Sequence, residues 1–133
     1  MSRKLNQKVG EMNYDGLITD INPPVEVRGR TVAAQGAEMT YKRGTIFTQG
    51  QNDKKLYILG SSATTESGAL FQDCVLCDDI TVGASEEATV AVYTAGCFNP
   101  DKTAVGAGYT ITEADKDELR KRNIVFKAAF DAN

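Results

Sequence analysis

The strongest β-strand pattern in the chain is ATVAVYTAG, residues 88–96. Valine, threonine and tyrosine favour extended backbone because branched and aromatic side chains pack well on a pleated surface. The residues that follow, Cys97–Asp101, contain an Asn-Pro pair, and proline cannot donate a hydrogen bond to a sheet. This stretch therefore predicts a strand that ends in a turn.

Other strand patterns precede this one at short intervals from residue 38 onward. They are Met39–Lys42, Thr45–Thr48, Lys54–Gly60 and Ala69–Cys77, separated by polar or glycine-containing turns. Many short strands joined by turns are typical of a β-sandwich or a small β-barrel. The sequence therefore predicts a mainly β fold, either a small β-barrel or a sandwich.

One short helix is predicted near the C-terminus. Thr112 occupies an N-cap position, acidic residues fill the first turns, and Arg120–Arg122 fill the last turn, so that both ends complement the helix dipole. Since few of its residues are apolar, we expect the helix to lie on the surface. Asn123 is expected to end it, and Ile124–Phe126 to return to the core as a strand.

The N-terminal segment differs from the rest of the chain in its composition and in the spacing of its apolar residues. Residues 1–37 contain Asn22-Pro23-Pro24 and apolar residues without a regular period. We therefore predict two parts, an extended N-terminal arm over residues 1–37 and a β-rich domain over residues 38–133. Within the arm, the alternating Val25–Arg28 is expected to form a short strand.

The composition restricts the possible functions. The chain has 133 residues and a net charge of −3, which fits one domain and offers no surplus positive charge for nucleic acid. Histidine, the usual general base and the commonest metal ligand, is absent. We therefore predict a protein that is not an enzyme and has no cofactor. Without an apolar run of about 18 residues or a signal peptide, we expect no membrane contact and synthesis in the cytoplasm.

Cys74 and Cys77 form a C-x-x-C pattern, which could serve a redox pair or half of a zinc site. The segment is predicted to be a strand, however, and positions three apart on a strand point to opposite faces. A zinc site would also need further ligands, and only Cys97 remains. We therefore expect the cysteines to be small packing residues.

Two other patterns also favour structural explanations. Asp78-Asp79, with Asp73 nearby, is interpreted as a solvated strand end or Asx-turn rather than a cation site. Gly106–Gly108 lacks the lysine of a phosphate-binding loop and precedes an acidic helical turn, so we expect a flexible turn there.

The order of segments from residue 38 to residue 126 resembles a known family. An apolar strand with an acidic turn, Cys74–Asp79, is followed by a strand that ends in Tyr93-x-x-Gly96-x-Phe98, and a charged helix then returns as a strand over residues 115–126. This order is similar to that of the head decoration proteins of tailed phages, the lambda-like capsid-stabilising family. The N-terminal arm is longer here, and residues 99–111 resemble an insertion.

The resemblance implies a small β-tulip-like domain that forms a homotrimer on the outer surface of the expanded phage head. It implies a virion protein whose partner is the major capsid protein, and whose role is to stabilise the shell against internal DNA pressure. It also implies that the N-terminal arm becomes ordered by adding extended backbone to capsid strands.

The arm supplies the candidate capsid-binding residues. An arm without a core cannot offset its own ordering entropy, whereas docking onto a strand edge supplies backbone hydrogen bonds and side-chain register. Three arms per trimer would strengthen a weak contact through effective concentration. The residues predicted to contact the capsid are Tyr14, Leu17, Ile18, Ile21, Pro23, Pro24, Val25 and Val27.

Two alternatives remain open at this point. The first is a non-catalytic small β-barrel binding module, which would bind a small ligand or act as a tail or surface adhesin. The second is a metal- or thiol-dependent enzyme, which would depend on the cysteines.

Overall fold

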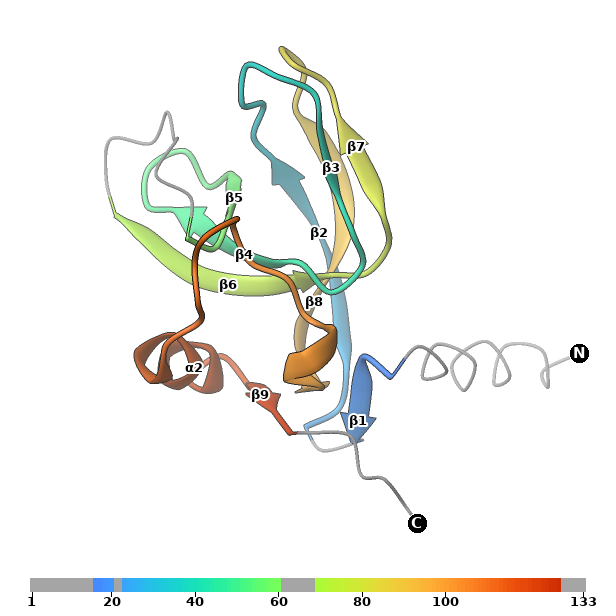
Figure 1. Cartoon of the computed structure of the whole chain (residues 1–133), viewed down its shortest axis with the longest axis vertical. Coiled ribbons are helices and arrows are strands. Elements are labelled where there is room, and N and C mark those ends of the chain that lie inside the picture. Colours follow the sequence, from blue (N-terminus) through green and yellow to red (C-terminus); the bar gives the residue numbers. More distant parts are fainter. Residues whose placement is uncertain (1–15, 21–22, 61–68, 128–133) are drawn as a thin grey trace, which may run out of the picture.

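The structure, a computed structural model, describes residues 16–20, 23–60 and 69–127. These residues form mainly β-structure with one short α-helix near the C-terminus, which confirms the predicted fold class (Figure 1). The strands are β1 (Ile18–Asp20), β2 (Glu26–Val32), β3 (Met39–Tyr41), β4 (Ile46–Gly50), β5 (Leu56–Ile58), β6 (Leu70–Leu76), β7 (Ile80–Val82), β8 (Ala88–Phe98) and β9 (Ile124–Phe126). The helices are the 3-10 turn η2 (Pro100–Lys102) and α2 (Glu113–Arg120).

Five strands close into a β-barrel in the order β8-β2-β5-β4-β6, because β6 pairs back onto β8. Neighbouring strands are antiparallel except for β2 and β5, which are parallel. Strands β3 and β7 form a separate ribbon near the end of the barrel where β8 begins (Figure 1). The small barrel that the strand spacing predicts is therefore present.

The strand with the strongest sequence pattern, β8, is the one on which the others converge. It is 11 residues long and pairs with β2 and β6 in the barrel, and near its end with β1 and β9. Its alternating side chains serve both faces of the barrel wall, since Val92 and Tyr93 belong to two different apolar clusters.

The first of these clusters, the inner core, fills the barrel. Its buried side chains come from all five barrel strands and from the β3–β7 ribbon, and they are Val32, Tyr41, Phe47, Leu56, Cys74, Leu76, Val82, Val90 and Val92. A barrel of this size has room for little more than its own side chains. The interior is therefore packed.

The second cluster, the outer core, lies on the other face of the wall. Ile46, Val75 and Tyr93 of the barrel strands contribute to it, and Leu119 of α2 and Ile124 of β9 cover them. The remaining surface of helix α2 is mostly charged. This largely polar sequence forms a stable helix here because Leu119 packs into the outer core.

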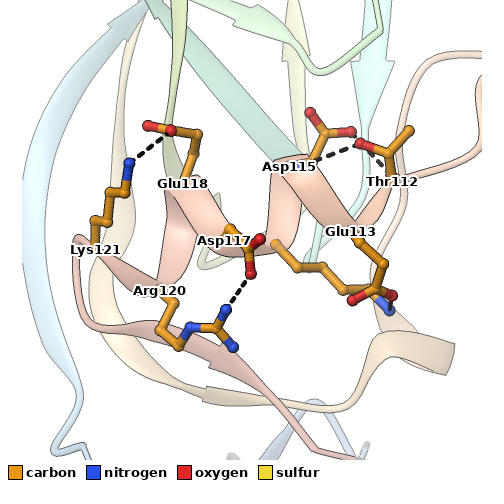
Figure 2. Close-up of polar contacts among 8 residues, drawn as sticks. Thr112, Glu113, Asp115, Asp117, Glu118, Arg120 and Lys121 are labelled. Atoms are coloured by element: carbon orange, nitrogen blue, oxygen red, sulfur yellow. Dashed lines mark hydrogen bonds and ion pairs between the residues drawn. The ribbon is translucent and has the colours of Figure 1, made fainter.

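The start of α2 is capped as its sequence predicts. The Thr112 hydroxyl accepts a hydrogen bond from the Asp115 N–H at 3.1 Å, and the Asp115 carboxylate accepts one from the Thr112 N–H at 3.0 Å. Figure 2 shows this capping box together with the ion pairs Asp117–Arg120 and Glu118–Lys121 on the exposed side of the helix. Asn123 follows with a positive φ of 67°, which ends the helical path.

The predicted boundary at residue 37 is wrong for the residues that the structure describes. Strand β1 pairs with the end of β8, and β2 pairs with β8 from Glu26 to Val32 and forms part of the barrel wall. The alternating Val25–Arg28 pattern is therefore the start of a longer strand, and its partner lies far along the chain, where no local pattern could reveal it. Residues 1–15 lie outside the described residues.

Candidate protein-binding surface

The structure divides the predicted capsid-binding residues into buried and exposed ones. Leu17 contradicts the prediction, because its side chain is 1% exposed and lies in the outer core, where it holds the N-terminal segment to its own domain. Ile18 also packs against this core and is half-buried. Tyr14 and Ile21 lie outside the described residues.

The remaining predicted residues surround the start of β2. Pro23 is half-buried and Pro24 is exposed, while Val25 and Val27 are exposed to 36% and 55%. We call these two residues the valine strip. Within the described ranges, the large hydrophobic side chains that are this exposed are Val25, Val27, Met39 and Phe71. Of these four exposed hydrophobic residues, the two of the valine strip are the nearest to each other in the sequence.

The valine strip continues into an open face of the sheet. Val27 pairs with Tyr93 of β8, and Gly29 pairs with Ala91, which is exposed. Apart from its two neighbours in the chain, no described residue has an atom within 4 Å of the position that a Cβ at Gly29 would take. Because cross-strand partners share a face, Val27, Gly29 and Ala91 form a shallow surface of small and apolar groups.

Strand β2 also has a backbone edge that lacks a complete partner. On the side away from β8, its pairing with β5 joins only Val32 to Leu56, continued by a hydrogen bond from the Ala33 N–H to the Leu56 carbonyl at 3.1 Å. Among the described residues, no strand pairs with this side of Glu26–Thr31. We call the backbone of Glu26–Thr31 on this side the open edge.

Positive charge gathers on the opposite face of β2. Arg28 and Arg30 pair with Val92 and Val90, which places both arginines on the inner face of the barrel wall. Asp73 of β6, which is 5% exposed, lies between Arg30 and Arg122, at 3.3 Å and 3.6 Å from their nitrogens. We call Arg28 and Arg30 the arginine face.

A β-bulge aims the Asp73 carboxylate at these arginines. In the pairing of β4 with β6, Phe47 lies opposite Cys74 and Thr48 lies opposite Gln72, so that Asp73 is the extra residue. A bulge redirects a side chain that regular alternation would send to the other face. This site could not be predicted, because the strand predicted over Val25–Arg28 stops before Arg30 and the bulge depends on the pairing of β6 with β4.

A second polar arrangement lies in a shallow hollow near the start of β8. The hollow is lined by Ala33, Ala34, Lys55, Ser85, Glu86 and Glu87. The Lys55 ammonium lies 2.6 Å from the Glu87 carboxylate, and this hydrogen bond and the Glu87 charge raise the pKa of Lys55. This arrangement is an exposed ion pair, and such pairs contribute little to stability.

The cysteines occupy different parts of the core, as the strand pattern predicts. Cys74 lies in the inner core and Cys77 in the outer core, and both are free thiols. Burial raises the pKa of the Cys74 thiol well above its usual value. Burial, followed by the charge of Asp78, raises that of Cys77 to about 11. Neither thiol therefore has the properties of a reactive nucleophile.

Comparison with protein-family models and with curated proteins found no match for this chain. Over the residues that the structure describes, no helix has the length and apolar character needed to cross a membrane. In the same residues, no group of three or more histidine, cysteine, aspartate or glutamate side chains is placed to hold a metal ion.

Proposed function

We propose that this chain is a head decoration protein of a tailed phage, which binds the outer surface of the expanded capsid as a homotrimer. In this role it stabilises the shell against the pressure of packaged DNA. The proposal is supported by the resemblance over residues 38–126 and by the small β-barrel. The observation that carries it is the exposed valine strip, Val25 and Val27, at the start of β2.

The valine strip has the properties of a protein-docking surface. Exposed apolar side chains two positions apart at the start of a rigid strand favour burial against another protein. Burying a fully exposed valine side chain contributes about 1.5 kcal/mol or more, and since both valines are already partly buried, the two of them would give a weak contact on their own. A trimer presents three such contacts at once, so that effective concentration converts weak binding into firm attachment.

The polar groups of the described residues favour a structural role over catalysis. Asp73 and Asp115 are buried, and both are engaged by hydrogen bonds or ion pairs that hold strands and the helix together. The packed inner core likewise disfavours the alternative of a barrel that binds a small ligand inside it. The other alternative is a surface-binding module such as an adhesin. The co-sedimentation experiment below distinguishes it from a decoration protein.

The test is co-sedimentation of the full chain with expanded and unexpanded shells of the cognate capsid protein. We expect binding to expanded shells, and we expect native mass measurement to give a trimer. The double variant Val25→Asp with Val27→Asp should lose most of this binding. Met39→Asp, which changes a similarly exposed side chain on β3, is the matched control and should bind normally.

Two outcomes would overturn the proposal. If the full chain does not sediment with expanded shells, the decoration role is wrong and the adhesin alternative is favoured. If the chain sediments and the double valine variant sediments equally well, the valine strip is not the contact. Removal of residues 1–15 then tests the remaining arm without disturbing β1 or β2.

A further inference from the structure

We propose that the open edge of β2, Glu26–Thr31, accepts an extended strand of a partner protein whose side chains alternate between apolar and acidic residues. This inference goes beyond the proposed function and does not depend on it, because it concerns the isolated protein. It also differs from the predicted arm mechanism, in which this segment would add to the edge of another protein.

The backbone of β2 provides the first part of the argument. One side of β2 is bound to β8 along Glu26–Val32, and the pairing with β5 on the other side joins only Val32 to Leu56. An edge that no described strand pairs with presents N–H and C=O groups as a template for another strand, and of these the Gly29 carbonyl already accepts a hydrogen bond from Arg30 Nη1 at 3.2 Å. The open edge is therefore long enough for a short extended segment.

The edge is held in a fixed conformation, which lowers the cost of binding. Strand β2 belongs to the closed barrel, and its Arg30 side chain is anchored to Asp73 of β6 at 3.3 Å. A preformed strand loses little conformational entropy when a partner binds, so that most of the cost falls on the incoming segment.

The two faces beside the edge differ in chemistry, and this difference selects the partner. On the outer face lie Val27 and the open position above Gly29, which would contact apolar side chains of the incoming strand. On the inner face lie Arg28 and Arg30, and the buried carboxylate of Asp73 balances Arg30 and is shared with Arg122 of the turn after α2.

Charge complementarity therefore favours carboxylates on the inner-facing side chains of the partner. Arg28 is exposed at the edge, and guanidinium groups bind carboxylates through paired hydrogen bonds. Glu26 lies on the same face as Arg28 by the alternation of β2, because the extra residue of the register shift beside it, Thr94, belongs to β8, and the two arginines of this face outnumber it. The favoured occupant is an extended segment in which every second residue is aspartate or glutamate and the others are apolar.

The experiment measures the binding of labelled peptides to the full chain by fluorescence anisotropy. The first probe is an eight-residue peptide that alternates valine and glutamate, and the second alternates valine and lysine. The third is the valine–glutamate peptide with alternate backbone nitrogens methylated. We expect the valine–glutamate peptide to bind at least about tenfold more tightly than either of the others.

Variants of the protein locate the site. Arg28→Glu should weaken binding of the valine–glutamate peptide by about tenfold or more and should improve binding of the valine–lysine peptide. Lys42→Glu makes the same type of change at an exposed position between β3 and β4, and should leave both affinities unchanged.

Equal affinity of the two unmethylated peptides for the wild-type chain would overturn the inference, and this comparison needs no variant to fold. Unchanged binding after methylation would show that the backbone edge is not used. Loss of peptide selectivity together with normal co-sedimentation would leave the proposed function intact, so that the two proposals fail separately.

Discussion

Arg30 Nε lies 3.3 Å from Oδ2 of Asp73, a carboxylate that is almost completely buried. The other oxygen of this carboxylate lies 3.6 Å from Arg122 Nη1. One bulged residue of β6 thus links the strand β2 to the turn that follows α2. This arrangement ties the N-terminal half of the fold to its C-terminal half through charge.

Replacing this carboxylate tests its contribution to stability. Asp73→Asn keeps the shape of the side chain but leaves Arg30 and Arg122 without their balancing charge. Because both arginines are partly exposed, solvent reduces the effect, and we expect a loss of about 1–3 kcal/mol in the free energy of unfolding. Urea unfolding measures it, with the exposed Asp101→Asn as a control that should change stability by less than about 0.5 kcal/mol.

The carboxylate of Asp115 should make the fold sensitive to acid. Burial alone would raise the pKa of Asp115, but hydrogen bonds from the Tyr109 hydroxyl, the Thr112 N–H and Gln72 outweigh burial and lower it. The unfolded chain therefore takes up this proton at a higher pH than the folded chain does. The stabilisation is present above the usual carboxyl pKa of about 4 and is lost as the pH falls through the lower, folded value.

Asp115→Asn should remove this part of the pH dependence. The difference in unfolding free energy between wild type and variant should be largest near neutral pH and should shrink as the pH falls below about 4. Urea unfolding at a series of pH values measures this difference. Asp117→Asn, on the exposed side of the same helix, is the matched control for the removal of a carboxylate from α2 (Figure 2). A constant difference for Asp115→Asn would contradict the assigned hydrogen bonds.

Gly60 should tolerate no side chain, for two separate reasons. Its φ of +92° is costly for other residues, and a Cβ at this position would overlap the ring of Tyr109. We therefore expect Gly60→Ala to lower the free energy of unfolding by about 2–4 kcal/mol. Gly36 has a similar φ of +82° but no atom within 4 Å of the Cβ position, so Gly36→Ala should cost only about 1 kcal/mol. Thermal unfolding of both variants separates backbone strain from overlap.

The thiols of the native protein should be unreactive. Cys74, Cys77 and Cys97 are buried, and the raised pKa values of Cys74 and Cys77 keep those two thiols protonated near pH 8. With Ellman's reagent at this pH, we expect slow reaction of the folded chain and rapid release of three equivalents after unfolding. One fast equivalent in the folded chain would show that a cysteine is accessible.

Features governed by neighbouring residues could be predicted from the sequence. Thr112 caps α2 and Asn123 ends its helical path, because capping depends on residues within one turn. The separation of Cys74 and Cys77 into two cores follows from the two-residue period of a strand. The strand pattern of β8 likewise shows in its own composition.

Features that depend on distant partners could not be predicted. Leu17 is predicted to lie in an arm because the apolar residues around it follow no regular period, and the core that receives its side chain is built by other segments. Val82 ends the three-residue strand β7 and packs in the inner core, although so short a strand has no local pattern of its own. The bulge that aims Asp73 at Arg30 arises from the pairing of β6 with β4, which no local pattern encodes.

Strand β8 pairs with β1, β2, β6 and β9, and its two ends mark two opposite ends of the molecule, which we call its poles. The first and last described strands, β1 and β9, both flank the end of β8, where Lys127 lies 3.0 Å from Asp20 (Figure 1). The connection from β7 to β8, residues 83–87, lies at the other pole. A peptide inserted at residues 84–86 would therefore be displayed at the end of the molecule opposite to β1 and β9.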